Sequence, residues 1–258
     1  MPVHPAAIVD PSARISASAD IGPFCVIGPY VKIGARTRLM ANIFVEGPIM
    51  IGEDNTFYPY STVGVAPQDL KYKGERSEVR IGSRNRIREF ATIHRGTEGG
   101  GMITQIGDDN LLMAYVHIAH DTQVGNHVVL SHGATCGGHV TVEDWAVVGA
   151  ATGIHQFCRI GRHAMVGGYS VITQDVLPYA TVSTKREPKI YGANAVGLER
   201  RGFPAATVEA LHKAFRLLAR SGLNTSQAVD RIRAEIPPVP ELDELLKFIE
   251  TSERGFVK

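Results

Sequence analysis

The sequence lacks an excess of charge of either sign. Its 258 residues include 27 lysines and arginines against 26 aspartates and glutamates. No global basic field therefore draws the chain to nucleic acid or to anionic lipid, and a charged partner must be bound by a local patch.

Long apolar runs and cysteine are also scarce. No run approaches the roughly 18 apolar residues of a membrane span, and the N-terminus has no basic segment followed by an apolar one. We expect a cytoplasmic protein without integral membrane association. Cys25, Cys136 and Cys158 are odd in number and lack Cys-x-x-Cys spacing, which argues against a disulfide scaffold and a zinc knuckle and predicts reduced thiols.

Apolar residues recur at every sixth position through most of the chain. The first series is Val9, Ile15, Ile21, Ile27, Ile33, Leu39, Val45, Ile51, Phe57 and Val63, continued by Ile81, Ile87 and Ile93. A second series, shifted by one residue, runs in steps of six from Ile106 to Ile172. Glycine often follows the apolar residue and asparagine closes some units, so we expect these two residue types to take the positive φ that sharp corners require.

A period of six fits neither a helix nor a long strand. It fits a short strand followed by a corner, with three sides closing a triangular coil of about 18 residues and coils stacked about 4.8 Å apart. The repeat makes about eight such coils. The sequence here resembles the hexapeptide-repeat acyltransferases, and the resemblance implies a mostly β fold, a left-handed parallel β-helix over residues 1–185.

Two interruptions break the repeat. Asp69 and Glu75 occupy in-phase positions and cannot face a dry core unpaired, so the chain is expected to loop out near 64–80. The second interruption, near 94–105, contains the run Gly99-Gly100-Gly101. A phosphate cradle is one interpretation, but no strand–Gly-x-Gly-x-x-Gly–helix pattern surrounds the run, and we favour a flexible loop.

The hexads stop near residue 180, and helical spacing follows. Apolar residues over 208–218 predict a helix that ends at Ser221-Gly222, and Asn224-Thr225 can cap a second helix reaching Ile236. Pro240 can begin a third. We therefore predict a small C-terminal α-helical domain over 190–258.

Histidine is concentrated in the middle of the repeat. With coils of 18 residues, His120 lies one coil from Gly138-His139 and two coils from Gln156, so the residues form one strip. The predicted strip, on a solvent-facing edge, comprises His117, His120, Asp121, His139, His155 and Gln156.

Three interpretations compete for this strip. The first is a set of surface histidines without function. The second is a zinc site, although the spacing here is His-x-x-His rather than the His-x4-His of carbonic-anhydrase-like prisms. The third, which we prefer, makes His120 a general base for a hydroxyl proton, with Asp121 as its orienting acid; their pairing is a hypothesis.

The resemblance becomes more specific in seven segments. Together they are similar to the UDP-N-acetylglucosamine O-acyltransferase family, which carries out the first step of lipid A biosynthesis, and the match covers essentially the whole chain. The segments are 68–72, 93–97, 110–113, 117–121, 138–140, 155–158 and 200–203.

By this resemblance, His120 deprotonates the glucosamine 3-hydroxyl, which attacks the thioester of a 3-hydroxyacyl group on acyl carrier protein. Asp121 orients His120, and the backbone N–H of Gly138 holds the oxyanion. The transfer is direct, so no cofactor is expected beyond the phosphopantetheine that carries the donor, and no metal.

The resemblance also implies the substrate contacts. Gly168 corresponds to the floor of the acyl groove, and its small size implies a chain near hydroxymyristoyl length; the alternative is an ordinary corner glycine. Arg200 and Arg201 correspond to residues that engage a nucleotide or phosphopantetheine phosphate; the alternative is a basic cap at a helix start. Residues implied to contact nucleotide sugar or acyl donor are Gln68, Asp69, Lys71, His117, His139, His155, Gln156 and Asn194.

Two departures from the family pattern stand out. The segment 183–188 is one residue longer than usual, and Val196 occupies the position of an acid used for the ribose. A 3-amino UDP-sugar is therefore kept as an alternative acceptor.

A C3 homotrimer is expected, with the histidine strip facing the next subunit. Acyl carrier protein is acidic, and its predicted dock is the basic C-terminal region with Lys185, Arg186, Lys189, Arg200, Arg201, Lys213, Arg216 and Arg220.

Three other functions remain as alternatives. The related N-acyltransferases usually carry an extra N-terminal domain, and hexads beginning at Val9 are expected to leave no room for one. A zinc hydratase and a non-catalytic scaffold are the other two.

Overall fold

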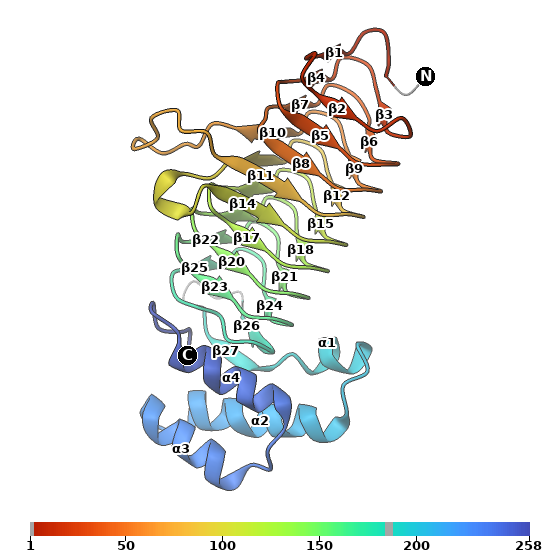
Figure 1. The fold of residues 1–258 in the computed structure, drawn as a ribbon. Helices are drawn as coiled ribbons and strands as arrows, with labels where there is room; N and C mark the ends of the chain where they lie inside the picture. The colour runs from red at the N-terminus through yellow and green to blue at the C-terminus, as the bar shows by residue number, and fades with distance from the viewer. Residues whose placement is uncertain (1–2, 184–187) are drawn as a thin grey trace.

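The computed structural model describes residues 3–183 and 188–258. Short parallel strands wind into a triangular prism, and helices lie at its C-terminal end (Figure 1). The three faces of the prism are three sheets. From β1 to β25, each strand pairs with the strand three positions away in chain order, which lies on the same face of the adjacent coil. The predicted β-helix prism followed by helices is confirmed.

Sheet I contains β1 (Ile8–Val9), β4 (Val26–Ile27), β7 (Phe44–Val45), β10 (Thr62–Val65), β13 (Thr92–His94), β16 (His117–Ile118), β19 (Thr135–Cys136), β22 (Gly153–Ile154) and β25 (Val171–Ile172). Sheet II contains β2 (Arg14–Ile15), β5 (Val31–Ile33), β8 (Ile49–Ile51), β11 (Glu78–Ile81), β14 (Ile103–Ile106), β17 (Gln123–Val124), β20 (Thr141–Val142) and β23 (Arg159–Ile160). Sheet III contains β3 (Asp20–Ile21), β6 (Arg38–Leu39), β9 (Thr56–Phe57), β12 (Arg86–Ile87), β15 (Leu111–Leu112), β18 (Val129–Leu130), β21 (Val147–Val148), β24 (Met165–Val166), β26 (Ala180–Val182) and β27 (Ile190–Ala193).

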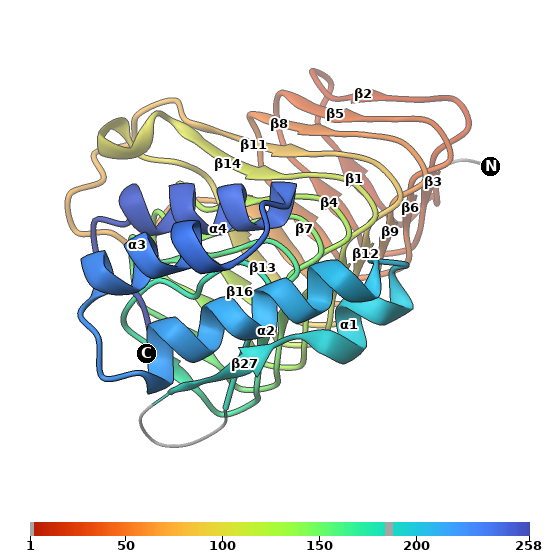
Figure 2. The ribbon, with the colours of Figure 1, turned by 90° about the horizontal axis from the view of Figure 1, so that it is seen from below.

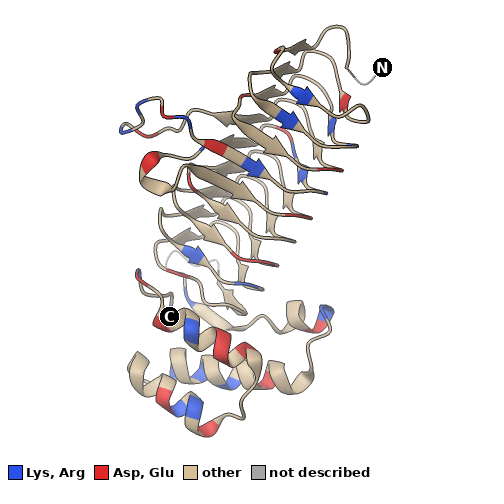
Figure 3. Ribbon diagram, in the orientation of Figure 1, with Lys and Arg blue, Asp and Glu red and all other residues tan. Residues whose placement is uncertain are grey.

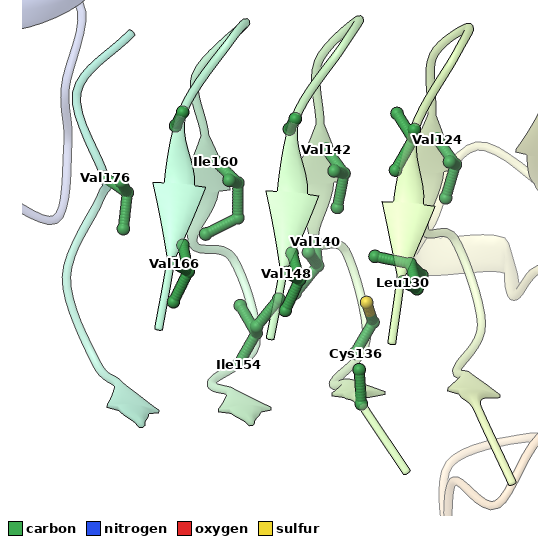
Figure 4. Packing of buried hydrophobic residues seen from close by; sticks show 14 of the residues in the cluster. Val124, Leu130, Cys136, Val140, Val142, Val148, Ile154, Ile160, Val166 and Val176 are labelled. Carbon is green, nitrogen blue, oxygen red and sulfur yellow. The ribbon is translucent and has the colours of Figure 1, made fainter. Parts of the chain in front are cut away.

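Each strand turns its repeat residue into the prism. In sheet I, Cys136 is in register with Ile118 on one side and Ile154 on the other. Equivalent residues of successive coils therefore stack in a column, as Figure 4 shows for Cys136 and Ile154. Every repeat residue is buried except Val9 and Ile15, which lie at the open N-terminal end. This column of aliphatic side chains is the core, and its burial is the main stabilising contribution to the prism.

The corners differ from the expectation drawn from glycine and asparagine. We call the corner between sheets I and II the first, that between II and III the second, and that between III and I the third. Positive φ angles occur at larger residues, such as Asp121 (60°) and His139 (61°) at the first corner and Trp145 (63°) at the second. Gly22 and Asn85 do not have positive φ, so the expectation was wrong.

Close approach between coils, rather than φ, requires glycine at the repeat positions. A Cβ atom on Gly22 would lie 1.6 Å from the carbonyl oxygen of Met40 in the next coil. A Cβ on Gly34 would lie 2.5 Å from the carbonyl oxygen of Gly52. The backbones of adjacent coils therefore leave no room for a side chain at these positions.

Asparagine serves as an interior ladder at the second corner. The side-chain amide of Asn85 donates to Oδ1 of Asn55 (3.0 Å) and to the carbonyl of Gly107 (2.9 Å). Its own Oδ1 accepts the backbone N–H of Asn110 at 2.9 Å. Each buried amide thus satisfies backbone groups of the neighbouring coils.

Both interruptions leave the prism at the first corner and project on the same side (Figure 1). The first excursion lies between β10, which ends at Val65, and β11; the second lies between β13 and β14. Both are shorter than the expected 64–80 and 94–105, because β11 pairs with β14 over four residues, Glu78 to Ile81.

The helices cover the C-terminal end of the prism (Figure 2). Predicted helices are confirmed as α2 (Ala205–Arg220), α3 (Thr225–Glu235) with Asn224 in a capping box, and α4 (Pro240–Glu250) with proline at its start. The short α1 (Ala195–Arg200) and the antiparallel pairing of β27 with β26 were not predicted. Among the described residues, no helix has the length and apolar character to cross a bilayer.

Candidate active site

The first corner carries a stack of rings from successive coils. His139 lies parallel to Phe157 with ring centroids 4.4 Å apart, and its ring meets His120 at a right angle, 5.1 Å away. The stacking follows from the 18-residue coil, which puts equivalent corner residues one above the other. The predicted juxtaposition of His120 with Gly138-His139 is confirmed.

His120 and Asp121 form a hydrogen-bonded pair. Nδ1 of His120 lies 2.8 Å from Oδ2 of Asp121, which confirms the predicted pairing. The side chain of His120 is 13% exposed and that of Asp121 is fully buried. The strip was expected to face solvent, and for Asp121 that expectation was wrong because the second excursion covers it.

The pair fixes the tautomer of His120. A carboxylate only accepts hydrogen bonds, so Nδ1 of His120 carries the proton that is shared with Asp121. Nε2 is then left with a free lone pair. Such a ring can take a proton from a hydroxyl and hold it, with the carboxylate stabilising the cation that forms.

Gly138 lies against the His120 ring, next to Cε1 and Nε2. A Cβ at residue 138 would lie 2.5 Å from Cε1 and 2.7 Å from Nε2 of His120, so only glycine leaves room for the ring. Within the described residues, the N–H of Gly138 has no acceptor. The N–H groups of His120 and Gln156 are also free at equivalent positions, and the place of Gly138 beside Nε2 is what distinguishes it.

The second excursion is folded onto the buried carboxylate. The N–H of Thr97 donates to both oxygens of Asp121 (2.9 and 3.1 Å), and its hydroxyl donates to Oδ2 at 2.6 Å. The 3-10 helix η1 (Glu98–Gly100) follows, and a Cβ on Gly100 would lie 1.9 Å from Cγ of Asp121. Gly100 therefore allows the loop to close over this carboxylate, and the loop is packed against the prism.

His117 projects from β16 in sheet I beside this pair. Its Nδ1 lies 2.7 Å from the hydroxyl of Thr92, and its ring meets His94 edge-on at 5.0 Å. Burial lowers the pKa of His117, and the nearby His120 lowers it further. Burial lowers the pKa of His94 to about 4. Both rings are therefore neutral near pH 7 and offer hydrogen bonds rather than charge.

Opposing influences act on the pKa of His139. Burial lowers its pKa, whereas the carboxylates of Asp121 and, more weakly, Asp69 raise it. Oδ2 of Asp121 lies 3.9 Å from Nε2 of His139.

The remaining predicted residues of this region are more exposed. His155 and Gln156 are exposed, with Nδ1 of His155 lying 3.0 Å from the carbonyl oxygen of Gln156. On the first excursion, Gln68 and Lys71 are exposed, and Oδ1 of Asp69 accepts the backbone N–H of Lys71 at 2.9 Å. These side chains can meet a ligand without first breaking a buried contact.

Arg95 ties the two excursions together. Its Nε donates to the hydroxyl of Tyr72 at 3.0 Å, and its other nitrogens contact the carbonyl of Gly47 and the carboxylate of Glu46. The carboxylate of Glu75 accepts the N–H of Glu98 at 3.3 Å. The loop that carries Lys71 is thus joined to the loop that covers Asp121.

Three ligand atoms of His120, Asp121 and His139 lie within 4.8 Å of one another, a spacing suited to a metal ion. Both carboxylate oxygens of Asp121 already accept protein hydrogen bonds, from Thr97 and His120. A cation would have to displace these donors. The residues therefore fit a hydrogen-bonded base better than a metal centre.

Two family models match the chain. Residues 103–138 match the model described as bacterial transferase hexapeptide (six repeats). Residues 175–257 match domain 2 of UDP N-acetylglucosamine O-acyltransferase.

A relative from Thermodesulfovibrio yellowstonii, an acyl-[acyl-carrier-protein]–UDP-N-acetylglucosamine O-acyltransferase, is 48% identical over 222 residues, covering 86% of each chain. A relative of the same name from Burkholderia lata is 47% identical over 213 residues, covering 81% of this chain and 80% of that one. The chain belongs to the UDP-N-acetylglucosamine O-acyltransferase family.

Solved structures of this family superpose on the whole chain. LpxA from Acinetobacter baumannii has a TM-score of 0.96 at 43% identity and covers 100% of both chains. LpxA from Bacteroides fragilis, a UDP-N-acetylglucosamine acyltransferase, has a TM-score of 0.96 at 38% identity, with 99% of this chain and 100% of that chain covered. The acyltransferase prism and its helical end are therefore shared over their full length.

Asn194 and Arg201, which correspond to positions of the O-acyltransferase family, lie at the second corner, away from His120. Asn194 is the N-cap of α1, accepting the N–H of Gly197 at 3.2 Å and donating to the carbonyl of His163 at 3.0 Å. Arg201 lies over the Trp145 ring, 5.2 Å from its centroid. The two corners are different edges of one prism, so one chain does not bring these residues to His120.

Arg200 and Arg201 do not begin a helix, so the alternative interpretation was wrong. Arg200 is the last residue of α1, and Arg201 is its C-cap. Arg200 is exposed, whereas burial lowers the pKa of Arg201, whose Nη2 donates to the carbonyl of Trp145 at 3.2 Å. Arg200 is the freer of the two guanidinium groups for a ligand.

Gly168 lies at the third corner, which borders the opposite edge of sheet I from the corner that carries His120. A Cβ there would lie 3.0 Å from the carbonyl oxygen of Ala150, so even alanine is tight. Val196 is exposed on α1. The segment 183–188 includes residues 184–187, which lie outside the described residues.

Sequence reasoning missed Thr97, Thr104 and His94 as parts of the site. Thr97 holds the carboxylate of Asp121, and the hydroxyl of Thr104 accepts the N–H of Asp121 at 2.8 Å. The available signals were the family-like segment 93–97, which contains His94 and Thr97, and the position of Thr97 two residues before a glycine run in a polar interruption. A loop that leaves the 18-residue register, however, carries no information about where it returns.

Proposed function

We propose that the chain transfers a 3-hydroxyacyl group from acyl carrier protein to the 3-hydroxyl of UDP-N-acetylglucosamine, the first step of lipid A biosynthesis. The observation that carries this proposal is the His120–Asp121 pair beside the free N–H of Gly138. A base with a free nitrogen and a donor for an oxyanion, one coil apart, is what acyl transfer to a hydroxyl requires.

The proposed reaction is a direct displacement. Nε2 of His120 takes the proton of the sugar 3-hydroxyl while that oxygen attacks the thioester carbonyl. The N–H of Gly138 stabilises the oxyanion, and loss of one such donor typically costs about 10²–10³ in rate. The intermediate collapses with cleavage of the carbon–sulfur bond, and His120 returns its proton to the leaving thiolate.

The proposed substrate contacts surround this pair. The ammonium of Lys71 is exposed, has no ion pair among the described residues and can neutralise a phosphate. The neutral imidazoles of His117 and His139 suit hydroxyl and amide groups of the sugar and the acyl donor. Further contacts are assigned to Gln68, Asp69, His155 and Gln156.

A C3 homotrimer completes the proposed site. His120 lies at the first corner and Asn194, Arg200 and Arg201 at the second, so a site that uses both sets takes them from two copies of the chain. We expect light scattering to give three chains per particle at concentrations where the protein is active. An active monomer would contradict this assignment.

The helical end is the proposed dock for acyl carrier protein, which is acidic. Lys213, Arg216 and Arg220 are exposed on α2, and Arg216 and Arg220 line a surface cavity of about 440 Å³ together with Tyr191. Figure 3 shows lysine and arginine in blue along the C-terminal helices, interspersed with acidic residues in red. Lys185 and Arg186, also assigned to this dock, lie outside the described residues. Transfer should weaken with ionic strength, and insensitivity to salt would count against the dock.

Gly168 is the proposed limit of the acyl groove. The absence of a side chain leaves the groove long, and a donor near hydroxymyristoyl length is expected. A larger residue, as in Gly168→Met, should shift the preferred donor to a shorter chain, measured by competition between donors of different length.

Mass spectrometry of the products tests the proposed reaction. Purified protein is mixed with UDP-N-acetylglucosamine and 3-hydroxyacyl carrier proteins of several chain lengths, with donor or acceptor omitted as controls. A product heavier by one 3-hydroxyacyl group and lost after mild base supports the O-acyl transfer. Absence of product with every donor would contradict it.

Two alternatives are separated by related measurements. A base-stable product formed only with a 3-amino UDP-sugar would indicate N-acylation, which the exposed Val196 keeps in consideration. The cluster of His120, Asp121 and His139 favours a zinc hydratase as the second candidate function. Elemental analysis showing stoichiometric zinc, together with CO₂ hydration, would support that function.

We also propose a cytoplasmic location and a two-domain organisation. The three cysteines are free and buried, as expected of reduced thiols in a reducing compartment. The proposed division places 1–185 in the prism domain and 190–258 in the helical domain. The boundary falls beside residues 184–187, outside the described residues.

A further inference from the structure

Asp121 is held by more donors than a pair with His120 needs. Its side chain is fully buried, and four hydrogen-bond contacts reach its two oxygens. Three of these contacts come from Thr97, through its N–H and its hydroxyl. A buried carboxylate is costly unless such donors replace water.

The backbone of Asp121 is fixed as well. Its N–H donates to the hydroxyl of Thr104 at 2.8 Å, and its φ is 60°. Gly100 lies directly against the carboxyl group, where a Cβ would overlap Cγ. Asp121 is therefore enclosed by its own corner on one side and by the second excursion on the other.

We propose that Thr97 is a positioning residue for the reaction, acting through Asp121 on His120. The Thr97 hydroxyl, 2.6 Å from Oδ2, holds that oxygen where it accepts the Nδ1 proton of His120. Without the hydroxyl, the carboxylate can rotate toward the remaining N–H of Thr97, and the His120 ring loses its fixed tautomer and direction. This inference rests on the proposed function, since it concerns the same base.

The geometry distinguishes a positioning role from a general packing role. Thr97 contacts Asp121 from a loop, not from the stacked coils, and its backbone is extended, with φ −127° and ψ 163°. Valine has the same shape as threonine and suits this conformation. Thr97→Val therefore removes one hydrogen-bond donor and leaves the N–H donor in place, but its methyl group cannot lie 2.6 Å from Oδ2 as the hydroxyl does. Thr97→Ala removes the same donor without placing a methyl group there.

The test compares steady-state acyl transfer by the wild type, Thr97→Val and Thr97→Ser. A displaced base lowers kcat, and we expect a loss of about 10-fold to 100-fold in Thr97→Val. KM for the nucleotide sugar should change less than threefold, because the Thr97 side chain is buried against Asp121. Thr97→Ser keeps the hydroxyl and should recover most of the rate.

Thr37→Val is the matched control. The Thr37 hydroxyl is also buried and donates to a backbone carbonyl, that of Gly52 at 2.8 Å, but it lies at the second corner in an early coil. Its loss should lower the melting temperature without lowering kcat. If Thr97→Val does not fold, Thr97→Ala, which also lacks the hydroxyl, takes its place.

An Asp121→Ala background shows whether Thr97 acts through Asp121. Adding Thr97→Val to Asp121→Ala should change kcat less than twofold, because the carboxylate is already gone. Multiplying losses would overturn the proposal, as would a wild-type kcat in Thr97→Val or equal losses in the valine and serine variants. An inactive wild type would instead overturn the proposed function, so the two failures are distinguishable.

Discussion

The first and second corners share one backbone plan and differ in what surrounds their rings. Both take positive φ at equivalent positions, and both stack aromatic rings from coil to coil. At the first corner, the stacked rings of His139 and Phe157 adjoin the polar side chain of His120. Two excursions project from this corner. At the second corner the stack is longer and comprises His127, Trp145, His163 and Tyr179.

Hydrogen bonding separates the two corners further. At the second corner, Arg84 binds Asp109 at 2.7 Å, and Arg201 covers Trp145. At the first corner, Nε2 of His120 and the N–H of Gly138 are left without partners among the described residues. Nδ1 of His163 at the second corner is also without a partner among the described residues, but it is buried within the ring stack. The comparison teaches that the repeat supplies register, and that chemistry requires free donors and acceptors that lie together, as Nε2 of His120 and the N–H of Gly138 do.

Removing one histidine from each corner gives the largest expected contrast. His120→Ala should lower kcat by about 10²–10⁴, because general-base catalysis contributes that much. His127→Ala removes a ring that is stacked on Trp145 at 3.9 Å and should cost stability instead. Product formation and melting temperature are measured for both, and equal losses of activity would erase the functional difference between the corners.

Two adjacent glycines sharpen the contrast within the first corner. Gly100→Ala forces a methyl group against the carboxylate of Asp121 and should lower kcat by about 10-fold to 100-fold. Gly99→Ala points into open space, with nothing within 4 Å of its Cβ, and should remain near wild type. The measurement is kcat of both variants at steady state. A similar loss of kcat in both would mean that activity depends on the flexibility of the glycine run and not on the contact between Gly100 and Asp121.

The asparagine ladder tests whether the second corner contributes stability alone. Asn85→Ala leaves the N–H of Asn110 and the carbonyl of Gly107 without partners and should lower the free energy of unfolding by about 2–3 kcal/mol. Asn126→Ala, half-buried at the same corner, should cost less. Thermal denaturation gives the stabilities, and kcat at 25 °C should be unchanged in both.

His163 makes the second corner sensitive to acid. Burial lowers its pKa to about 4, and the nearby Arg201 and Arg162 act in the same direction. The unfolded chain binds the proton near pH 6.5 and the folded chain only near 4, so stability falls as the pH drops through that window.

His163→Phe keeps a ring between Trp145 and Tyr179 and removes the titrating group. The melting temperature of the variant should fall less than that of the wild type between pH 7 and pH 5. The buried His94 accounts for part of the remaining decrease. Parallel pH curves for the two proteins would show that His163 does not contribute.

The sequence predicted whatever depends on the 18-residue coil. The inward column and the meeting of His120 with Gly138 follow from counting along the chain. The pairing of Asp121 with His120, which adjacency in the sequence did not establish, was a hypothesis that the structure confirms. Thr97 was missed because a loop outside the register can return anywhere.

Other misses have a similar physical cause. The stacking of Arg201 on Trp145 depends on how α1 docks, which local sequence does not specify. The expectation of positive φ at glycine failed because the limiting quantity at Gly22 is the distance between coils, a property of the stacked prism and not of one turn.

The stacking of whole coils also sets a unit of length along the molecule. Between the coil of His120 and the helices lie the coils of β19, β22 and β25, each joined to the next by main-chain hydrogen bonds. The separation between the proposed base and the α2 surface therefore changes only in steps of about 4.8 Å, the thickness of one coil. For a carrier protein bound to α2, the distance to the proposed base is therefore set by the number of coils between them. A point substitution cannot change that distance by a fraction of one coil.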